Sequence, residues 1–186
     1  MPFQFKPCRD MAGPVIVEPR CLADNRGFFM ETFKQSEFAA HGIVLPFVQD
    51  NHSLSVGPVV RGLHYQLPPK SQGKLLRVLQ GRIWDVAVDL RAESPTFLKW
   101  MALELDDRGH RMFYIPPGFA HGFAALSEQV QLFYKCTAEY DARLERGIRW
   151  NDPQLNLPWP LDSAQVSPRD SQLPLLDIDD FKDIAW

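Results

Sequence analysis

The sequence has few cysteines, no long apolar run and little net charge, and each shortage excludes a class of protein. Cys8, Cys21 and Cys136 are far apart and show no CxxC spacing, which argues against a disulfide framework and a thiolate zinc site. No apolar run approaches the roughly 20 residues that a membrane span needs. The net charge is -3 and no Lys/Arg run occurs, so we expect neither a membrane nor a nucleic-acid partner.

The chain also lacks features that would divide it or export it. Its 186 residues are enough for one well-buried core and few for two. Since it has no internal repeat, low-complexity segment or linker, we expect a single domain over residues 1–186. The N-terminal segment has no basic stretch followed by an apolar one, so we expect no secretory signal and a cytoplasmic location.

Strand patterns dominate the middle of the chain. In Ile83–Arg91 the even positions are apolar, whereas the odd positions include Asp85 and Asp89. This period of two predicts a strand with one buried face. Helix signals are weak, at Ser36–His41 and around Leu175–Lys182. Further strand-like runs are Lys74–Leu79, Trp100–Leu105, Met112–Ile115, His121–Leu126 and Val130–Thr137. Many short strands predict a mostly β sandwich or barrel with a few short peripheral helices and a ligand cavity at its mouth.

Three segments carry polar residues that the strand pattern does not require. They are Arg61–Gln66 followed by Lys74, then Pro116–Phe123, and finally Val130–Thr137 with Tyr134. Lys74 and Tyr134 each share the parity of apolar neighbours on their strands. If that parity faces the interior, both side chains point inward and need partners or a polar ligand.

Each of these residues also has a purely structural interpretation. His64 beside a strand can be a hydrogen-bonded structural residue, and Lys74 at a strand start can extend to solvent. Tyr134 can belong to the core with its hydroxyl bonded elsewhere, and His121 can cap the Pro-Gly turn before it. A catalytic interpretation therefore requires that these side chains converge in space.

The turn before His121 raises the question of a metal. The pattern Pro116-x-Gly118-x-x-His121 matches the second half of the cupin signature. The first half of that signature supplies two histidines and a glutamate, but the corresponding place has only His64, and no acidic residue occurs between Asn51 and Asp85. This is a poor ligand set for zinc or iron. We therefore expect a cupin-type jelly roll that works without a metal, and without a nicotinamide cofactor because no GxGxxG motif is present.

A series of separate motifs, in order from about Ile16 to about Leu176, resembles the dTDP-4-dehydrorhamnose 3,5-epimerase family. Many motifs in the right order are far more specific than one short pattern. The motifs are Asp24–Glu31, Gln49–Ser53, Val60–Gln66, Gln72–Leu75, Asp85–Arg91, Ser94–Phe97, Ile115–Phe123, Trp150–Pro153 and Ser167–Asp170.

The resemblance implies roles at matching positions. His64 would be the base, Asp170 the partner that orients it, Tyr134 the proton donor on the opposite face and Lys74 the residue that stabilises an enolate. The positions implied to bind the nucleotide or the sugar are Arg26, Phe28, Glu31, Gln49, Asn51, Arg61, His121, Tyr140, Glu145 and Arg169. Two departures stand out, because Arg169 replaces the usual lysine and Leu98 replaces a usual glycine.

The implied reaction inverts C3 and C5 of dTDP-4-dehydro-6-deoxy-D-glucose, giving dTDP-4-dehydro-L-rhamnose for dTDP-L-rhamnose biosynthesis. The C4 ketone acidifies both hydrogens, the enolate needs a fixed donor, and inversion needs a second acid across the pocket. The resemblance also implies a homodimer whose active sites borrow residues from the partner. Three alternatives stay open: an epimerase that acts at C3 or C5 alone, a metal-dependent cupin, and a sugar-binding cupin without catalysis.

Overall fold

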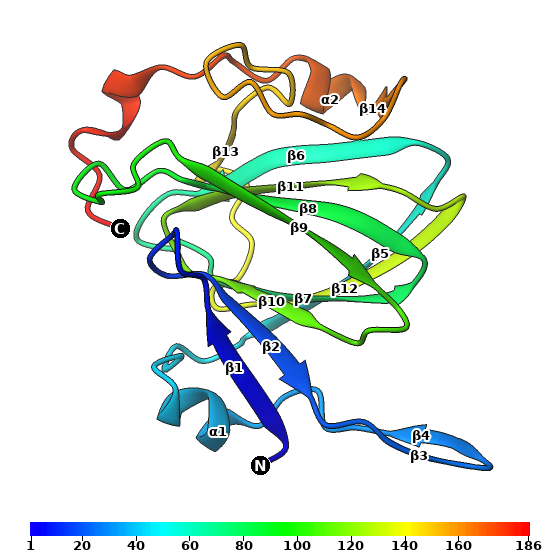
Figure 1. Ribbon diagram of the computed structural model, residues 1–186. Helices are drawn as coiled ribbons and strands as arrows, with labels where there is room; N and C mark the ends of the chain where they lie inside the picture. The colour runs from blue at the N-terminus through cyan, green and yellow to red at the C-terminus, as the bar shows by residue number, and fades with distance from the viewer.

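The computed structural model describes residues 1–186 and consists of two antiparallel sheets packed face to face (Figure 1). The first sheet has the order β1-β2-β10-β7-β12-β5, and the second has the order β13-β6-β11-β8-β9, with β14 pairing in parallel with β6. The strands of the first sheet are β1 (Phe3–Pro7), β2 (Val15–Pro19), β10 (Met112–Ile115), β7 (Lys74–Gln80), β12 (Gln129–Cys136) and β5 (Gln49–Val56). The strands of the second are β13 (Glu145–Gly147), β6 (Val59–Gln66), β11 (Phe119–Ala125), β8 (Arg82–Asp89), β9 (Trp100–Asp106) and β14 (Gln165–Val166). The predicted sandwich is confirmed.

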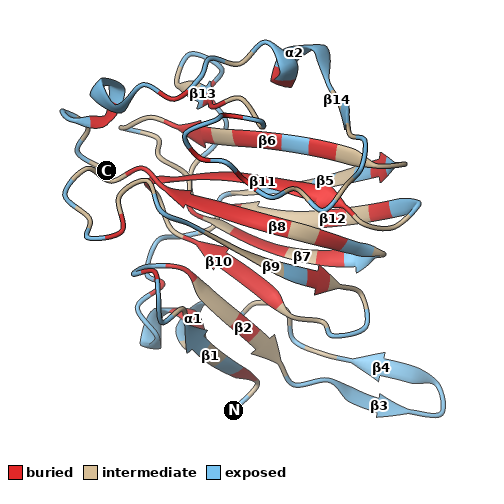
Figure 2. Cartoon of the chain, turned by 45° about the horizontal axis from the view of Figure 1, so that its top comes forward, coloured by how far each residue is buried: buried red, intermediate tan, exposed pale blue.

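The remaining elements are small and peripheral. Strands β3 (Leu22–Asp24) and β4 (Gly27–Phe29) form a hairpin that projects from the body of the molecule and is exposed along its whole length (Figure 2). Helix α1 (Gln35–Ala40) confirms the expected short helix. The stretch predicted as a C-terminal helix holds only a four-residue 3-10 helix, η1 (Ile178–Phe181), and a second short helix, α2 (Pro168–Ser171), was not predicted. No helix of the fold is both long and apolar enough to cross a membrane.

Three apolar layers hold the sheets together. The central layer lies between them and includes Leu76, Phe113, Phe123 and Leu132. Each sheet also buries its outer face, the first beneath α1 and the second beneath the chain that follows β13. At about 25 cal/mol for each Å² of apolar surface removed from water, these layers supply the main favourable contribution to folding.

The second sheet is covered by an apolar layer on each face, and this makes one prediction wrong. Strand β8 was expected to bury one face, yet Asp85 and Asp89 are both fully buried. The even positions, such as Val86 and Val88, pack into the outer layer, while the odd positions face the space between the sheets. On this strand the apolar even positions face the outer layer, so the carboxylates at the odd positions lie between the two sheets. Asp89 is bonded to Arg91 and to two nearby hydroxyl groups.

The first sheet follows the expected orientation. Leu76 of β7 and Leu132 of β12 belong to the central layer, so Lys74 and Tyr134, which share their parity, also face the interior. At Leu98, where glycine is usual in the resembled family, the backbone has φ of 59°. Leu98 therefore adopts a left-handed conformation, which costs a residue with a Cβ roughly 1–2 kcal/mol.

Candidate active site

A cavity of about 270 Å³ lies between the sheets and joins side chains from five parts of the chain. The catalytic interpretation requires His64, Lys74, Tyr134 and His121 to converge. The first three reach this cavity, from β6, β7 and β12, whereas His121 is not among its lining residues. The lining residues are Gln49, Asn51, His64, Tyr65, Gln66, Gln72, Lys74, Tyr134, Cys136, Tyr140 and Glu145. Seven of the predicted site residues are in this set, which we call the His64 cavity.

His64 is paired with a carboxylate from a distant part of the chain. Its Nε2 atom lies 2.8 Å from Oδ1 of Asp170, and the other Asp170 oxygen accepts the Gly62 N–H at 3.1 Å. Asp170 is in α2, which begins after Ser167, whose hydroxyl accepts the Asp170 N–H. Because Nε2 is engaged, Nδ1 is the ring nitrogen without a protein partner. This is the arrangement in which a carboxylate fixes the tautomer of a histidine base.

The surroundings of Asp170 keep its carboxylate ionised. Burial alone would raise the pKa, but the hydrogen bonds from His64 and Gly62 outweigh burial and hold the pKa of Asp170 below its usual value. The Asp170 side chain is 6% exposed and that of His64 is 30% exposed. The carboxylate is thus shielded, while the imidazole remains accessible from the cavity.

Two glycines allow His64 to be placed there. A Cβ on Gly62 would lie 2.6 Å from the Gly122 Cα, and a Cβ on Gly122 would lie 2.7 Å from the Arg61 carbonyl oxygen. Gly62 also has φ of 118°, a conformation that other residues avoid. The close approach of β6 and β11, with a register shift beside Gly122, puts His64 directly opposite His121.

Lys74 and Tyr134 face His64 from the opposite sheet. Lys74 is opposite Cys136 in the β7–β12 pairing, and Tyr134 is two residues before Cys136, so both side chains are on one face of the sheet. Burial lowers the pKa of Lys74, and burial raises the pKa of Tyr134. The tyrosine is therefore protonated at neutral pH, and the charged form of Lys74 is costly in this cavity unless a negative group, such as one on a substrate, lies beside it.

A second histidine–aspartate pair was missed by the sequence analysis. His121 Nε2 lies 2.8 Å from Oδ2 of Asp85, and both side chains are buried. Oδ1 of Asp85 is buried without a hydrogen-bond partner. Burial raises the pKa of Asp85 against the opposing effect of His121, and burial lowers the pKa of His121. The signal for Asp85 was its place in a family motif, but its strand parity suggested an outward side chain. His121, predicted to bind substrate, is not part of the His64 cavity lining.

The rim of the cavity is held by hydrogen bonds among predicted binding residues. Gln49 donates to Asn51 at 3.0 Å and accepts the backbone N–H of Tyr140 at 2.7 Å. Tyr140 donates its hydroxyl to Glu145, and Arg169 forms an ion pair with the same carboxylate oxygen. These five residues therefore form one connected edge.

Arg61 lies on the other side of His64. Its guanidinium donates to the Ser55 hydroxyl at 3.1 Å and to the Leu54 carbonyl at 3.0 Å. It borders a second hollow of about 400 Å³ that also includes His64, Arg169 and Asp170. Two guanidinium groups beside one hollow suit an anionic group such as a phosphate.

Three further predicted binding residues lie in or beside the projecting hairpin and not at the His64 cavity. Arg26 is in the projecting hairpin and pairs with Asp24 at 2.6 Å. Phe28 is 57% exposed, with its ring 4.8 Å from that of His110. Glu31 borders a separate hollow near the N-terminus. The structure thus places these three residues apart from the side chains that gather around His64.

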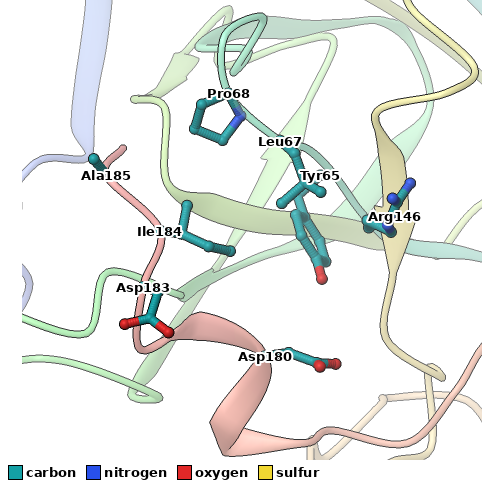
Figure 3. A pocket seen from close by; sticks show the side chains of 8 residues that line it. All are labelled: Tyr65, Leu67, Pro68, Arg146, Asp180, Asp183, Ile184 and Ala185. Atoms are coloured by element: carbon teal, nitrogen blue, oxygen red, sulfur yellow. The ribbon is translucent and has the colours of Figure 1, made fainter.

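A larger cavity, of about 490 Å³, lies outside the second sheet. The C-terminal segment and the β6–β7 connection form its walls, and the Tyr65 hydroxyl points toward Asp180 (Figure 3). It holds none of the predicted site residues, and volume alone is a weaker guide to chemistry than convergent polar groups. No cluster of three or more His, Cys, Asp or Glu side chains in the structure is suited to hold a metal ion.

Comparison with known proteins connects this geometry to a family. The family model described as dTDP-4-dehydrorhamnose 3,5-epimerase matches residues 9–177. The chain belongs to this family. A dTDP-4-dehydrorhamnose 3,5-epimerase from Methanothermobacter thermautotrophicus is 50% identical over 150 residues, covering 81% of this chain and 80% of that protein. A less similar relative, the dTDP-4-dehydrorhamnose 3-epimerase of Streptomyces niveus, is 39% identical over 161 residues, covering 86% and 78%.

Solved structures of the family have the same fold. The dTDP-6-deoxy-D-glucose-3,5-epimerase of Legionella pneumophila, solved in complex with dTDP-4-keto-L-rhamnose, superposes with a TM-score of 0.89. It is 43% identical, and the match covers 93% of this chain and 92% of that one. The predicted family, cupin-type fold and enzyme class, an epimerase of the dTDP-rhamnose pathway, are confirmed.

Proposed function

We propose that this chain converts dTDP-4-dehydro-6-deoxy-D-glucose into dTDP-4-dehydro-L-rhamnose, with His64 as the base and Tyr134 as the acid. The observation that carries this proposal is the convergence of a carboxylate-bound histidine, a lysine and a tyrosine on one cavity. His64 comes from one sheet, and Lys74 and Tyr134 come from the other. A sugar ring between the sheets has a base on one face and an acid on the other.

In the first half of each inversion, His64 removes the proton next to the ketone. The electron pair of the C–H bond moves into the ring, and negative charge develops on the C4 oxygen. Lys74 supplies a donor for that oxygen in a partly dry cavity, where such an interaction is worth more than in water. Asp170 stabilises the imidazolium that forms.

In the second half, the Tyr134 hydroxyl gives its proton to the same carbon from the opposite face. The ketone re-forms, the configuration is inverted, and proton exchange with water restores the tyrosine and the histidine. The same set acts at C3 and at C5, because both hydrogens flank the one ketone. The net change involves no electron transfer.

The hairpin residues Arg26 and Phe28, together with Glu31, support a further element of the proposal. They match family positions that bind the nucleotide, yet they project away from the cavity of their own chain. In a homodimer the hairpin can reach the neighbouring active site. Size-exclusion chromatography with light scattering tests the dimer, and cell fractionation tests the cytoplasmic location expected from the sequence.

Epimerisation in deuterated water tests the reaction. With dTDP-4-keto-6-deoxyglucose, deuterium at both C3 and C5, followed by NMR and mass analysis, is the expected result. Label at one carbon would support the mono-epimerase instead, and no label would leave a sugar-binding protein. Loss of activity after thorough chelation, restored by added metal, would support the metal-dependent alternative.

A further inference from the structure

The predicted binding residue Arg169 makes its main contact with the protein. Its guanidinium pairs with the Glu145 carboxylate, and the same Glu145 oxygen accepts the Tyr140 hydroxyl at 2.5 Å. Arg169 is 61% exposed at its side chain, whereas Glu145 is only 14% exposed. The carboxylate is therefore largely shielded from water and is satisfied by these two donors. We call Arg169, Glu145 and Tyr140 the rim clasp.

The rim clasp connects three segments around the His64 cavity. Arg169 is in α2, Glu145 is in β13 opposite Gln66, and Tyr140 is in the loop between β12 and β13. The hydrogen bonds of Arg169 and Tyr140 to Glu145 outweigh burial and hold the pKa of that carboxylate below its usual value. Glu145 is thus a fixed anion that can hold both partners.

Tyr140 is the member of the clasp that faces the ligand space. Half of its surface is exposed, and it lines the mouth of the cavity, with its backbone N–H bound to Gln49. A cavity of about 270 Å³ is at the small end for a ligand of this size. Under the proposed function the sugar would occupy this cavity and the nucleoside diphosphate would extend across the rim, where an aromatic face suits a planar base.

We propose that Arg169 is a positioning residue for substrate binding, which acts through Glu145 to fix the Tyr140 ring at the cavity mouth. This inference rests on the proposed epimerase function. Fixing the ring before binding reduces the entropy lost on association, which improves affinity without a new substrate contact. An arginine suits the task because its fork can direct donors to the shared carboxylate, whereas the lysine usual in the family is a point charge.

Kinetics of Arg169→Ala and Arg169→Lys test the assignment. We expect Arg169→Ala to raise KM for the dTDP-sugar about tenfold with kcat within about twofold, the pattern for lost binding that is equal in ground and transition states. Arg169→Lys should recover part of the loss. The matched control is Arg82→Ala, which removes the exposed Arg82–Glu104 pair on β8 and β9, away from the cavity, and should leave KM unchanged.

The double variant Arg169→Ala/Tyr140→Phe distinguishes positioning from direct contact. Tyr140→Phe keeps the ring and removes the hydroxyl, so it should resemble Arg169→Ala, and the double variant should be no worse than either single one. Additive losses would overturn the proposal, since they mean that Arg169 contacts substrate independently of Tyr140. A fall in kcat at unchanged KM would also overturn it, because Arg169 would then act through the adjacent Asp170.

Failure of this inference can be separated from failure of the proposed function. At saturating substrate, Arg169→Ala should still incorporate deuterium at C3 and C5, as the unmodified protein does. Absence of label in the unmodified protein defeats the proposed reaction, whereas normal label with unchanged KM in Arg169→Ala defeats the positioning role alone. Circular dichroism of both Arg169 variants confirms that each is folded.

Discussion

The structure holds two histidine–aspartate pairs whose histidines are on neighbouring strands, and in both the ring nitrogen is 2.8 Å from the carboxylate. Their histidines, His64 and His121, are directly opposite each other in the β6–β11 pairing. Yet the His64 side chain is 30% exposed and that of His121 is 10% exposed. Asp170 has both oxygens bonded, while Asp85 has one buried oxygen without a partner. Equal hydrogen-bond length therefore does not indicate equal chemistry.

The difference lies in what surrounds each carboxylate. The pKa of Asp170 is lowered because its hydrogen bonds outweigh burial, whereas the pKa of Asp85 is raised because burial outweighs the attraction of His121. A base needs an ionised partner to stabilise its imidazolium and needs access to substrate. The His64 pair meets both conditions, whereas His121 is outside the cavity lining. Four predictions test this contrast.

The largest effect is expected at the bases themselves. His64→Asn should lower kcat by about 10²–10⁴-fold, the usual range for a general base, while dTDP binding measured by calorimetry stays within a few-fold. His121→Asn should lower kcat by about tenfold or less, because this ring is outside the cavity lining. Equal losses in the two variants would mean that both pairs take part in proton transfer.

The carboxylates should differ in the same direction, with a smaller effect. We expect Asp170→Asn to lower kcat by about 10²-fold, since the amide cannot stabilise an imidazolium and can favour the wrong tautomer. Asp85→Asn should cost about tenfold or less, because Asp85 pairs with His121 rather than with His64 and is outside the cavity lining. Steady-state rates across pH provide the measurement, and a greater loss in Asp85→Asn would reverse the assignment.

The pH dependence of stability should have opposite signs at the two carboxylates. The pKa of Asp170 is lower in the folded than in the unfolded protein, so its carboxylate contributes to the free energy of unfolding. This contribution is present above the unfolded pKa of about 3.9 and is lost as pH falls below it. The pKa of Asp85 is higher in the folded than in the unfolded protein. Its contribution to the free energy of unfolding is therefore complete below about pH 3.9 and is lost as pH rises through the pKa of the folded state. The Asp85 carboxylate also stabilises the protonated form of His121. Loss of this interaction in Asp85→Asn likewise costs more stability at low pH than at high pH.

Urea unfolding of each variant beside the unmodified protein measures these signs. The advantage of the unmodified protein over Asp170→Asn should grow with pH and level off above about pH 5. Its advantage over Asp85→Asn should shrink as pH rises above about 4. The same trend in both would show that the two carboxylates ionise alike.

The smallest effect is expected from the support of Asp170. Ser167 caps α2 by accepting the Asp170 N–H at 3.0 Å, and no such cap exists at Asp85, which is inside a strand. Ser167→Ala should cost roughly 0.5–2 kcal/mol locally and lower kcat by about two- to fivefold. Ser171→Ala is the control, because its hydroxyl binds only the Pro168 carbonyl, and it should leave kcat unchanged.

The contrast also explains what the sequence could predict. Period two correctly placed Lys74 and Tyr134 inside, because their strands bury apolar neighbours of the same parity in the central layer. The same rule failed at Asp85, since β8 has a second apolar layer on its outer face. Periodicity separates the two faces of a strand but does not identify what covers each face.

Contacts between residues far apart in the sequence could not be predicted from local sequence patterns. His64 and Asp170 are 106 residues apart, and only the family resemblance suggested that they meet. The rim clasp was equally hidden, because Glu145 and Arg169 were each expected to bind substrate rather than one another. Helix α2 gave no periodic signal, as four residues held by one cap are too few for periodicity to detect.

Gly62 and Gly122 have a consequence for interpreting related genomes. A single methyl group on either residue would meet backbone atoms at 2.6–2.7 Å, so β6 and β11 would separate and His64 would shift relative to Lys74 and Tyr134. A paralogue with alanine at either position can therefore retain every catalytic side chain and still be a pseudoenzyme. Surveys that assign activity from the acid–base residues alone should also require both glycines.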